Sequence, residues 1–179
     1  MEPKHSVIVL LGSNIDPERN MPAAFARLAR HPDLTLVGRS RVYSTEPVGG
    51  QGPQPRFANA AVHLHTRLTP EQLRRTLRKL ETEMGRVRTA DKYAPRPMDM
   101  DIVLYDDFVG SVDGSPIPDP DLLRHPHVAI PCGELAPERR HPITGQTLAE
   151  IAAAMDRSTI DIDTCNGIDT FNGEEGEAA

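Results

Sequence analysis

The stretch Met98-Asp99-Met100-Asp101-Ile102-Val103-Leu104-Tyr105 alternates apolar residues with two acids at its start and predicts a β-strand. Because successive side chains leave opposite faces of a strand, both carboxylates should leave the same face, with Cα atoms about 6.5–7 Å apart. At that spacing two carboxylates can share hard cations through their oxygen atoms. The acid pair therefore predicts a cation site at the start of this strand.

An Arg beside the acid pair extends this interpretation. Arg96 lies between Pro95 and Pro97, which keep it out of a helix. Its planar guanidinium can bind a phosphate, so the Arg and the two acids together predict a magnesium–polyphosphate site. The alternative is a strand edge with two solvated Asp residues, which the short pattern alone does not exclude.

Length and composition limit the class of protein. The 179 residues suit one domain with an adequate core, and the net charge of −6 argues against a nucleic-acid partner. The sequence has no apolar run of membrane-spanning length and no signal-peptide pattern. Its two cysteines, Cys132 and Cys165, give neither a disulfide framework nor zinc-ligand spacing. We therefore expect a cytoplasmic protein that acts on small molecules, as a monomer or a weak homodimer.

Hydrophobic periodicity predicts an α+β fold of the ferredoxin-like type, βαββαβ, with helices packed on one face of an antiparallel sheet. The second helix has clear ends, because Thr69 is a good N-cap, Gln72 completes a capping box and Gly85 stops it. Glu81 lies beside the apolar stripe of this helix, so its carboxylate lies either against the sheet or at a wet edge. The expected strands are 7–11, 34–44, 57–66 and 98–105, and the expected helices are 17–30 and 70–84.

The rest of the chain is expected to form loops and a tail. The Gly- and Pro-rich segment 45–55, which we expect to be mobile, and the basic segment 86–93 show no helix or strand pattern. Beyond Tyr105 the chain looks irregular, apart from a short element that begins at Leu135 and a last helix over 148–155. Apolar residues become rare after that helix. The expected division is one domain over 1–155 and an acidic, disordered tail over 156–179.

Motifs spread along the chain resemble the 6-hydroxymethyl-7,8-dihydropterin pyrophosphokinase family of folate biosynthesis. The resemblance runs from about residue 7 to residue 151, and its strongest motif is 95–101, the Pro-Arg-Pro-Met-Asp-Met-Asp sequence. The other motifs are 12–14, 43–49, 57–60, Glu81 with 85–88, and, more weakly, 134–137 and 141–148. Their order and spacing identify the chain as similar to this family.

The resemblance implies that ATP gives its β,γ-pyrophosphoryl group to the hydroxymethyl group of the pterin and leaves as AMP. Asp99 and Asp101 would hold two magnesium ions, and Arg86 and Arg96 would act with them as catalytic residues that stabilise phosphate charge. The residues implied on the ATP side are Glu81, Arg86, Arg88, Tyr93, Arg96 and His125.

On the pterin side, the resemblance implies a flat slot with a polar edge. Phe57 would stack on the ring, and Asn59 would read its edge, because a carboxamide both donates and accepts hydrogen bonds. Their alternatives are a core aromatic residue and a locally bonded strand residue. Thr45 and Val48 would lie around the same edge. His127 falls where the family has a second stacking Phe, and an imidazole there can titrate near neutral pH; a capping or core role is its alternative.

Two other functions would use the same residues. A magnesium-dependent phosphohydrolase would need only Asp99 and Asp101, and it would release product from ATP without a pterin. A non-catalytic ferredoxin-like module that binds a nucleotide or a pterin would not need two acids on one strand face with three Arg residues nearby. AMP release that depends on the pterin distinguishes transfer from both alternatives.

Overall fold

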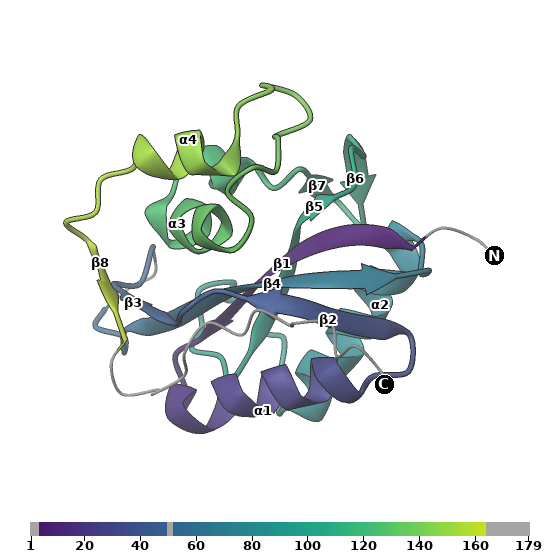
Figure 1. The fold of residues 1–179 in the computed structure, drawn as a ribbon. Helices are drawn as coiled ribbons and strands as arrows, with labels where there is room; N and C mark the ends of the chain where they lie inside the picture. The colour runs from purple at the N-terminus through teal and green to yellow at the C-terminus, as the bar shows by residue number, and fades with distance from the viewer. Residues whose placement is uncertain (1–3, 50–51, 164–179) are drawn as a thin grey trace, which may run out of the picture.

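An antiparallel sheet forms the centre of the molecule (Figure 1). β1 (His5–Ser13) lies between β4 (Phe57–Thr66) and β5 (Asp99–Tyr105), and β4 pairs on its other side with β2 (Leu34–Arg39) and β3 (Tyr43–Thr45). This arrangement of a βαββαβ unit confirms the ferredoxin-like prediction. The computed structural model describes residues 4–49 and 52–163 of the chain.

Two helices, α1 (Pro17–Arg30) and α2 (Pro70–Glu83), cover one face of the sheet, as predicted. The predicted capping box starts α2: the Gln72 N–H donates to Thr69 Oγ1, and the Thr69 N–H donates to Gln72 Oε1. Gly85 follows this helix with φ of 92°, a conformation that favours glycine. Apolar side chains of both helices pack against alternate residues of the central strands and form the larger core.

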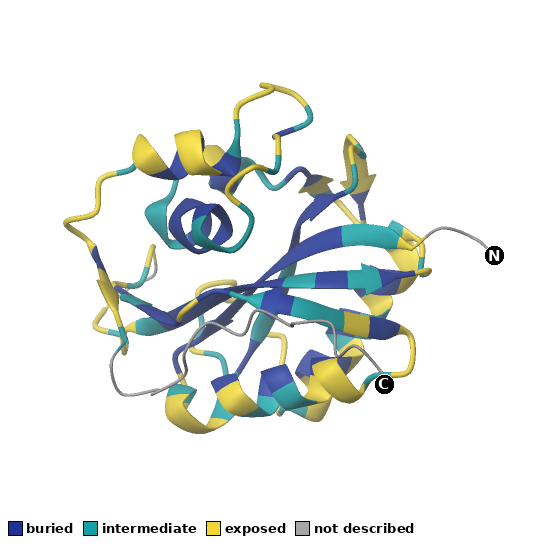
Figure 2. Cartoon of the chain, viewed as in Figure 1, coloured by how far each residue is buried: buried dark blue, intermediate teal, exposed yellow. Residues whose placement is uncertain are grey.

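The other face of the sheet is covered by α3 (Pro126–Leu135) and α4 (Leu148–Ala153), two helices that lie outside the βαββαβ unit (Figures 1 and 2). Leu135 ends a helix and does not begin an element. Pro131 inside α3 removes a helix signal. The helix is also buried along most of its length, which removes the polar stripe that an amphipathic helix would show.

The expected strand over 34–44 is divided into β2 and β3. The pairing of β2 with β4 shifts register between Leu36 and Gly38, which marks a bulge. Ser40 then bonds Ala61 through both its backbone N–H and its side-chain oxygen, at 2.9 Å each, in place of regular pairing. Alternation alone does not reveal this interruption, because the residues on either side of it still look like strand.

Part of the segment expected to be a tail belongs to the sheet. β8 (Ile160–Ile162) pairs with β3, and Ile160 is buried against Tyr43 and Ile130. Residues 164–179, which carry the rest of the expected tail, lie outside the described residues. None of the described helices is long and apolar enough to cross a membrane.

The segment after β5 returns the chain to the edge of the sheet where β5 begins. It forms a hairpin of β6 (Gly110–Val112) and β7 (Ser115–Ile117) and then a 3-10 helix, η1 (Pro120–Leu123). This path places Asp119 and Asp121 close to the acidic start of β5. The expected irregular region is therefore only partly irregular, and it contributes to the site.

Candidate active site

The site is built around one row of residues across the sheet. Gly12, at the end of β1, pairs with Asn59 of β4 on one side and with Asp99 of β5 on the other. A Cβ at Gly12 would lie 3.5 Å from Asn59 Oδ1 and 3.8 Å from Phe57 Cδ1. The absent side chain therefore leaves space beside the Asn59 amide and the Phe57 ring.

The two acids of β5 leave the same face, as their alternation predicted. Met100 and Ile102 pack into the core with α1 and α2, so Asp99 and Asp101 point to the side of α3. The side chains of Asp99 and Asp101 are 21% and 41% exposed, respectively. Both carboxylates are thus accessible to a ligand.

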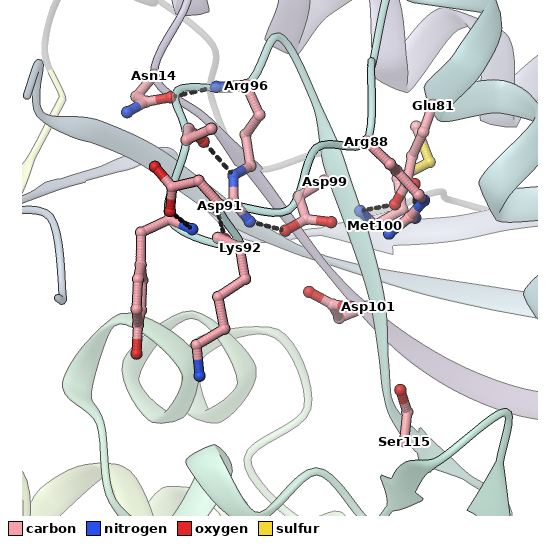
Figure 3. Close-up of polar contacts among 12 residues, drawn as sticks. Asn14, Glu81, Arg88, Asp91, Lys92, Arg96, Asp99, Met100, Asp101 and Ser115 are labelled. Carbon is pink, nitrogen blue, oxygen red and sulfur yellow. Dashed lines mark hydrogen bonds and ion pairs between the residues drawn. The ribbon is translucent and has the colours of Figure 1, made fainter. Parts of the chain in front are cut away.

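Arg96 connects the loop before β5 to Asn14, the residue that follows β1, through hydrogen bonds (Figure 3). Its backbone N–H donates to Asn14 Oδ1 at 2.7 Å, and its carbonyl oxygen accepts from the Asn14 N–H at 3.1 Å. Its Nη1 donates to Asp99 Oδ2 at 2.7 Å, and its guanidinium carbon lies 5.8 Å from the centre of the Phe57 ring. Arg96 therefore connects the acid pair with the aromatic wall of the site.

Glu81 of α2 lies against the sheet, the first of its two predicted positions, and is only 1% exposed. Its Oε1 accepts from the Met100 N–H and its Oε2 accepts from Arg88 Nη2, both at 2.7 Å (Figure 3). Burial, followed by the charge of Asp99, raises the pKa of Glu81. Among the described residues it lines none of the three cavities below, so it can act on a ligand only by holding Arg88 and β5.

The surroundings of Asp101 disfavour its negative charge. The carboxyl group lies in a recess where it is surrounded by protein atoms, although water still reaches it. This desolvation, followed by the charge of Asp99, raises the pKa of Asp101 to about 7. Arg74 of α2 opposes the shift with an ion pair of 3.2 Å from its Nη1 to Asp101 Oδ1.

A first cavity, of about 430 Å³, brings together most of the predicted residues. Its walls come from the last part of β1, the first residues of β4 and β5, the loop after β3, the basic loop that includes residues 86–93, and the start of α3. Inside it, Asn59 is 3% exposed, and its Nδ2 donates to Thr45 Oγ1 at 2.8 Å. The predicted residues that line this cavity are Thr45, Val48, Phe57, Asn59, Tyr93, Arg96, Asp99, Asp101, His125 and His127.

Two smaller cavities adjoin the first. The third cavity, of about 290 Å³, is lined by the cations Arg74, Arg86, Arg88, Lys92 and Arg96 and by the acids Asp91, Asp99 and Asp101. The second cavity, of about 260 Å³, has apolar walls from Ile102, Val112, Pro116 and Ile117 and polar groups from Arg74, Asp101, Ser115, Asp119 and Asp121. Asp101 lines all three cavities and therefore marks the point where they meet.

His125 and His127 lie side by side at the start of α3, with ring centres 5.4 Å apart. His125 Nε2 lies 3.7 Å from Asp121 Oδ1. Burial, followed by the neighbouring His125, lowers the pKa of His127 to about 4. The expectation that this imidazole titrates near neutral pH was therefore wrong, because the ring is neutral at pH 7.

The two loops expected from the sequence touch each other over the first cavity. Gly49 has φ of 78°, and a Cβ there would lie 2.6 Å from Cε1 of Tyr93. Gln54 Nε2 also donates to the Tyr93 carbonyl oxygen at 2.9 Å. The Tyr93 ring, 40% exposed, therefore rests on the glycine of the opposite loop.

Arg74 was missed by the sequence analysis, although one signal pointed to it. It precedes Glu81 by seven residues, which is two helical turns, so both lie on the side of α2 that faces β5. Lys92, Asp119 and Asp121 were missed as well, because each lines the site through a loop path that periodicity does not predict.

The carboxylates fit magnesium that arrives with a polyphosphate. Within the part of the chain that the structure describes, no three His, Cys, Asp or Glu side chains are grouped to hold a metal ion. Magnesium, however, is usually held by one or two carboxylates together with phosphate oxygens and waters. Asp99 and Asp101 would supply the carboxylates, and the cations that line the third cavity would bind the phosphates.

Comparisons of sequence agree with this chemistry. The family model described as 7,8-dihydro-6-hydroxymethylpterin-pyrophosphokinase matches residues 8–137. The chain is 36% identical to the 2-amino-4-hydroxy-6-hydroxymethyldihydropteridine pyrophosphokinase of Pseudomonas aeruginosa over 149 residues, which cover 83% of this chain and 90% of that protein. It is 36% identical to the Methylorubrum extorquens protein of the same name over 152 residues, which cover 84% and 94% of the two chains.

Solved structures support the fold. The chain superposes on the crystal structure of wild-type Plasmodium falciparum HPPK-DHPS with pteroate, with a TM-score of 0.65 at 12% sequence identity. The match covers 86% of this chain and 43% of that chain, so this chain spans less than half of that longer protein.

Proposed function

The chain belongs to the 7,8-dihydro-6-hydroxymethylpterin-pyrophosphokinase family, and we propose that each of its three cavities binds a different part of the two substrates. As a member of this family it is an ATP-dependent pyrophosphokinase of folate biosynthesis. The pterin would lie in the first cavity, the phosphates in the third and the nucleoside in the second. The observation that carries this assignment is that Asp101 lines all three.

The first cavity suits a flat heterocycle with a hydrogen-bonding edge. Phe57 would provide a face for stacking, and His127, neutral at pH 7 and on the same cavity, would offer a second ring. Asn59 is held by Thr45, so its carboxamide is fixed toward the slot before a ligand arrives. Val48 supplies an apolar rim. These residues are the proposed pterin site.

The third cavity suits a polyphosphate chain. Arg86, Arg88 and Arg96 line it, and their planar guanidinium groups can bind phosphate oxygens in pairs. Glu81 would act indirectly, by accepting a hydrogen bond from Arg88 and so holding its guanidinium in place. Tyr93 and His125 line the neighbouring first cavity, and in our proposal they would contact the nucleotide from there. Magnesium bound by Asp99 and Asp101, two ions in our proposal, would neutralise phosphate charge and align the transferred group.

In the transfer step, the hydroxymethyl oxygen of the pterin attacks the β-phosphorus of ATP, and the hydroxyl proton passes to solvent water. The bond from the β-phosphorus to the oxygen of the α-phosphate breaks, and AMP leaves with that electron pair. Arg86 and Arg96 would stabilise the charge that develops on these oxygens, and the slot would hold the attacking oxygen in line.

We also propose that residues 1–155, together with β8, which pairs with β3, carry the pyrophosphokinase activity. The protein would act in the cytoplasm on ATP and the pterin, as a monomer or a weak homodimer. It would need neither a nucleic acid nor a membrane as a partner.

The decisive experiment is to incubate the protein with ATP, magnesium and the hydroxymethyl dihydropterin and to identify the products by mass. We expect the pterin pyrophosphate and AMP in equal amounts, and no product from Asp99→Ala or Asp101→Ala. AMP or ADP released without the pterin would instead indicate a phosphohydrolase, and binding without product would indicate a non-catalytic module.

A further inference from the structure

Arg74 of α2 is an unusually buried cation. The residue is 8% exposed, and its two ionic and polar contacts are both long: Nη1 to Asp101 Oδ1 at 3.2 Å and Nη2 to Ser115 Oγ at 3.4 Å. Its Nε is buried and has no hydrogen-bond partner. A buried charge is costly unless its donors are satisfied, so this guanidinium has more donor capacity than the protein uses.

The position of Arg74 suggests what would satisfy it. It lines the second and third cavities and lies beside Asp101, where those cavities meet the first. The third cavity already carries Arg86, Arg88 and Arg96 on its walls. The Nε of Arg86 is likewise buried without a partner. The Nε of Arg78, on the same helix but on none of the three cavities, is also buried without a partner, so an unpaired Nε alone does not mark a ligand. The five cations that line the third cavity, Arg74 among them, indicate a ligand rich in acceptor oxygens.

We propose that Arg74 is a further phosphate-binding residue that is held on Asp101 while the nucleotide is absent. When ATP binds, Arg74 transfers its hydrogen bonds to phosphate oxygens, and Asp101 Oδ1 becomes free for the divalent cation. This inference rests on the proposed function, because it assumes that the third cavity holds the phosphates.

The proposal links two binding events through one side chain. Without nucleotide, Arg74 competes with any divalent cation for Asp101 and so weakens the binding of free cations. With nucleotide, the guanidinium gains better acceptors and the carboxylate is released. Because such a coupling is reciprocal, the nucleotide strengthens cation binding by the same factor as the cation strengthens nucleotide binding.

Arg78 provides a matched control on the same helix. It lies one turn beyond Arg74, and its Nη1 donates to Asp113 Oδ2 at 2.8 Å. Among the described residues it lines none of the three cavities. Removing its guanidinium changes the charge of α2 equally but leaves the site untouched.

The test compares Arg74→Met, Arg74→Lys and Arg78→Met with the parent protein. Met retains the packed stem and removes the charge, and thermal melting checks that each variant is folded. Nucleotide affinity is measured by calorimetry with magnesium and α,β-methylene ATP, whose α–β link cannot be broken. Cation affinity is measured without nucleotide, by electron paramagnetic resonance with Mn²⁺.

We expect Arg74→Met to bind the ATP analogue about 10- to 100-fold more weakly, as for loss of a hydrogen bond to a charged group. The same variant should bind Mn²⁺ about two- to fivefold more tightly, because a partly exposed ion pair no longer competes. Arg74→Lys should recover part of the analogue affinity, and Arg78→Met should match the parent in both measurements. A merely structural role for Arg74 would not move the two affinities in opposite directions.

Unchanged analogue affinity in folded Arg74→Met would overturn the proposal, and so would weaker Mn²⁺ binding in that variant. A parent protein that fails to bind the analogue would instead overturn the proposed function.

Discussion

At the scale of single residues, Asp101 shows how the site opposes folding. The group that lines all three cavities lies where desolvation and Asp99 raise its pKa to about 7. In the unfolded chain the same carboxyl has a pKa near 3.8. Between these two values the folded protein binds more protons than the unfolded chain, so stability falls as pH rises through this window. Above pH 7 the full penalty is present.

Replacing Asp101 by Asn should therefore stabilise the cation-free protein and abolish turnover. The side chain is 41% exposed, so solvent screening reduces the gain to the order of 1 kcal/mol, or about 2–4 °C in melting temperature. The difference from the parent should be largest at pH 8 and vanish near pH 4, measured by thermal melting in the presence of a chelator. A constant difference at all pH values would contradict the assignment of the shift to this carboxyl group.

His127 provides a second prediction at this scale. Because burial lowers its pKa to about 4, His127 should add no pH dependence to pterin affinity between pH 6.5 and 8, and the pH profiles of the parent and His127→Phe should coincide there. His127→Phe should keep or tighten pterin binding, and His127→Ala should weaken it by about 1–3 kcal/mol if base–aromatic stacking energies apply. Fluorescence titration with the pterin measures the affinities.

Thermal melting of the same two variants separates stacking from structure. If His127 only caps or packs the start of α3, both substitutions lower the melting temperature while the pterin affinity of the folded protein stays constant. Equal pterin affinity in His127→Phe and His127→Ala would therefore exclude a stacking role.

At the scale of elements, the predictable parts of the fold were those with local rules. The capping box of Thr69 and Gln72 and the stop at Gly85 depend only on residues at the ends of one helix, and they were predicted correctly. The helix α3 could not be predicted, because Pro131 inside it argues against a helix and its burial removes the polar face. Arg74 required knowing that α2 packs on β5 so that residues 27 positions apart meet.

The basic loop after α2 leads to a third prediction. Arg86→Ala and Arg88→Ala should each reduce pyrophosphoryl transfer by at least tenfold, since charge-assisted hydrogen bonds contribute roughly 1.5–3 kcal/mol. Pterin affinity without nucleotide should hardly change, because both residues line the third cavity and not the first. Arg75→Ala, an exposed change on α2, is the control. Calorimetry that finds an equal loss of binary pterin affinity would refute this separation of roles.

At the scale of the whole molecule, the sheet gathers the site at one edge. β1 ends at this edge while β4 and β5 begin there, so residues far apart in sequence meet: Asn59, Gly12 and Asp99 are direct neighbours across the strands. The fold class and the acid pair followed from the sequence, since both depend on periodicity. The meeting of three cavities at Asp101 did not, because it depends on the path of the chain through the hairpin, η1 and α3.

The C-terminal strand leads to the last prediction, which concerns the sheet as a unit. β8 extends the sheet beside β3, and its Ile160 is buried against Tyr43. Arg56, next to Phe57, bonds the Ser44 carbonyl oxygen at 3.1 Å and Asp161 Oδ2 at 3.2 Å. The end of the chain therefore supports the strand that carries Thr45 into the first cavity.

Deleting residues 160–179 should lower the melting temperature by about 3–10 °C, from the lost burial of one isoleucine and the lost strand pairing. It should also weaken pterin binding, because β3 and the loop after it lose their outer support. Deleting only residues 164–179 is the matched control, and it should leave both quantities unchanged, since that segment is acidic and poor in apolar residues. Equal effects of the two deletions, measured by thermal melting and pterin titration, would show that β8 is not the part of the C-terminus that supports the site.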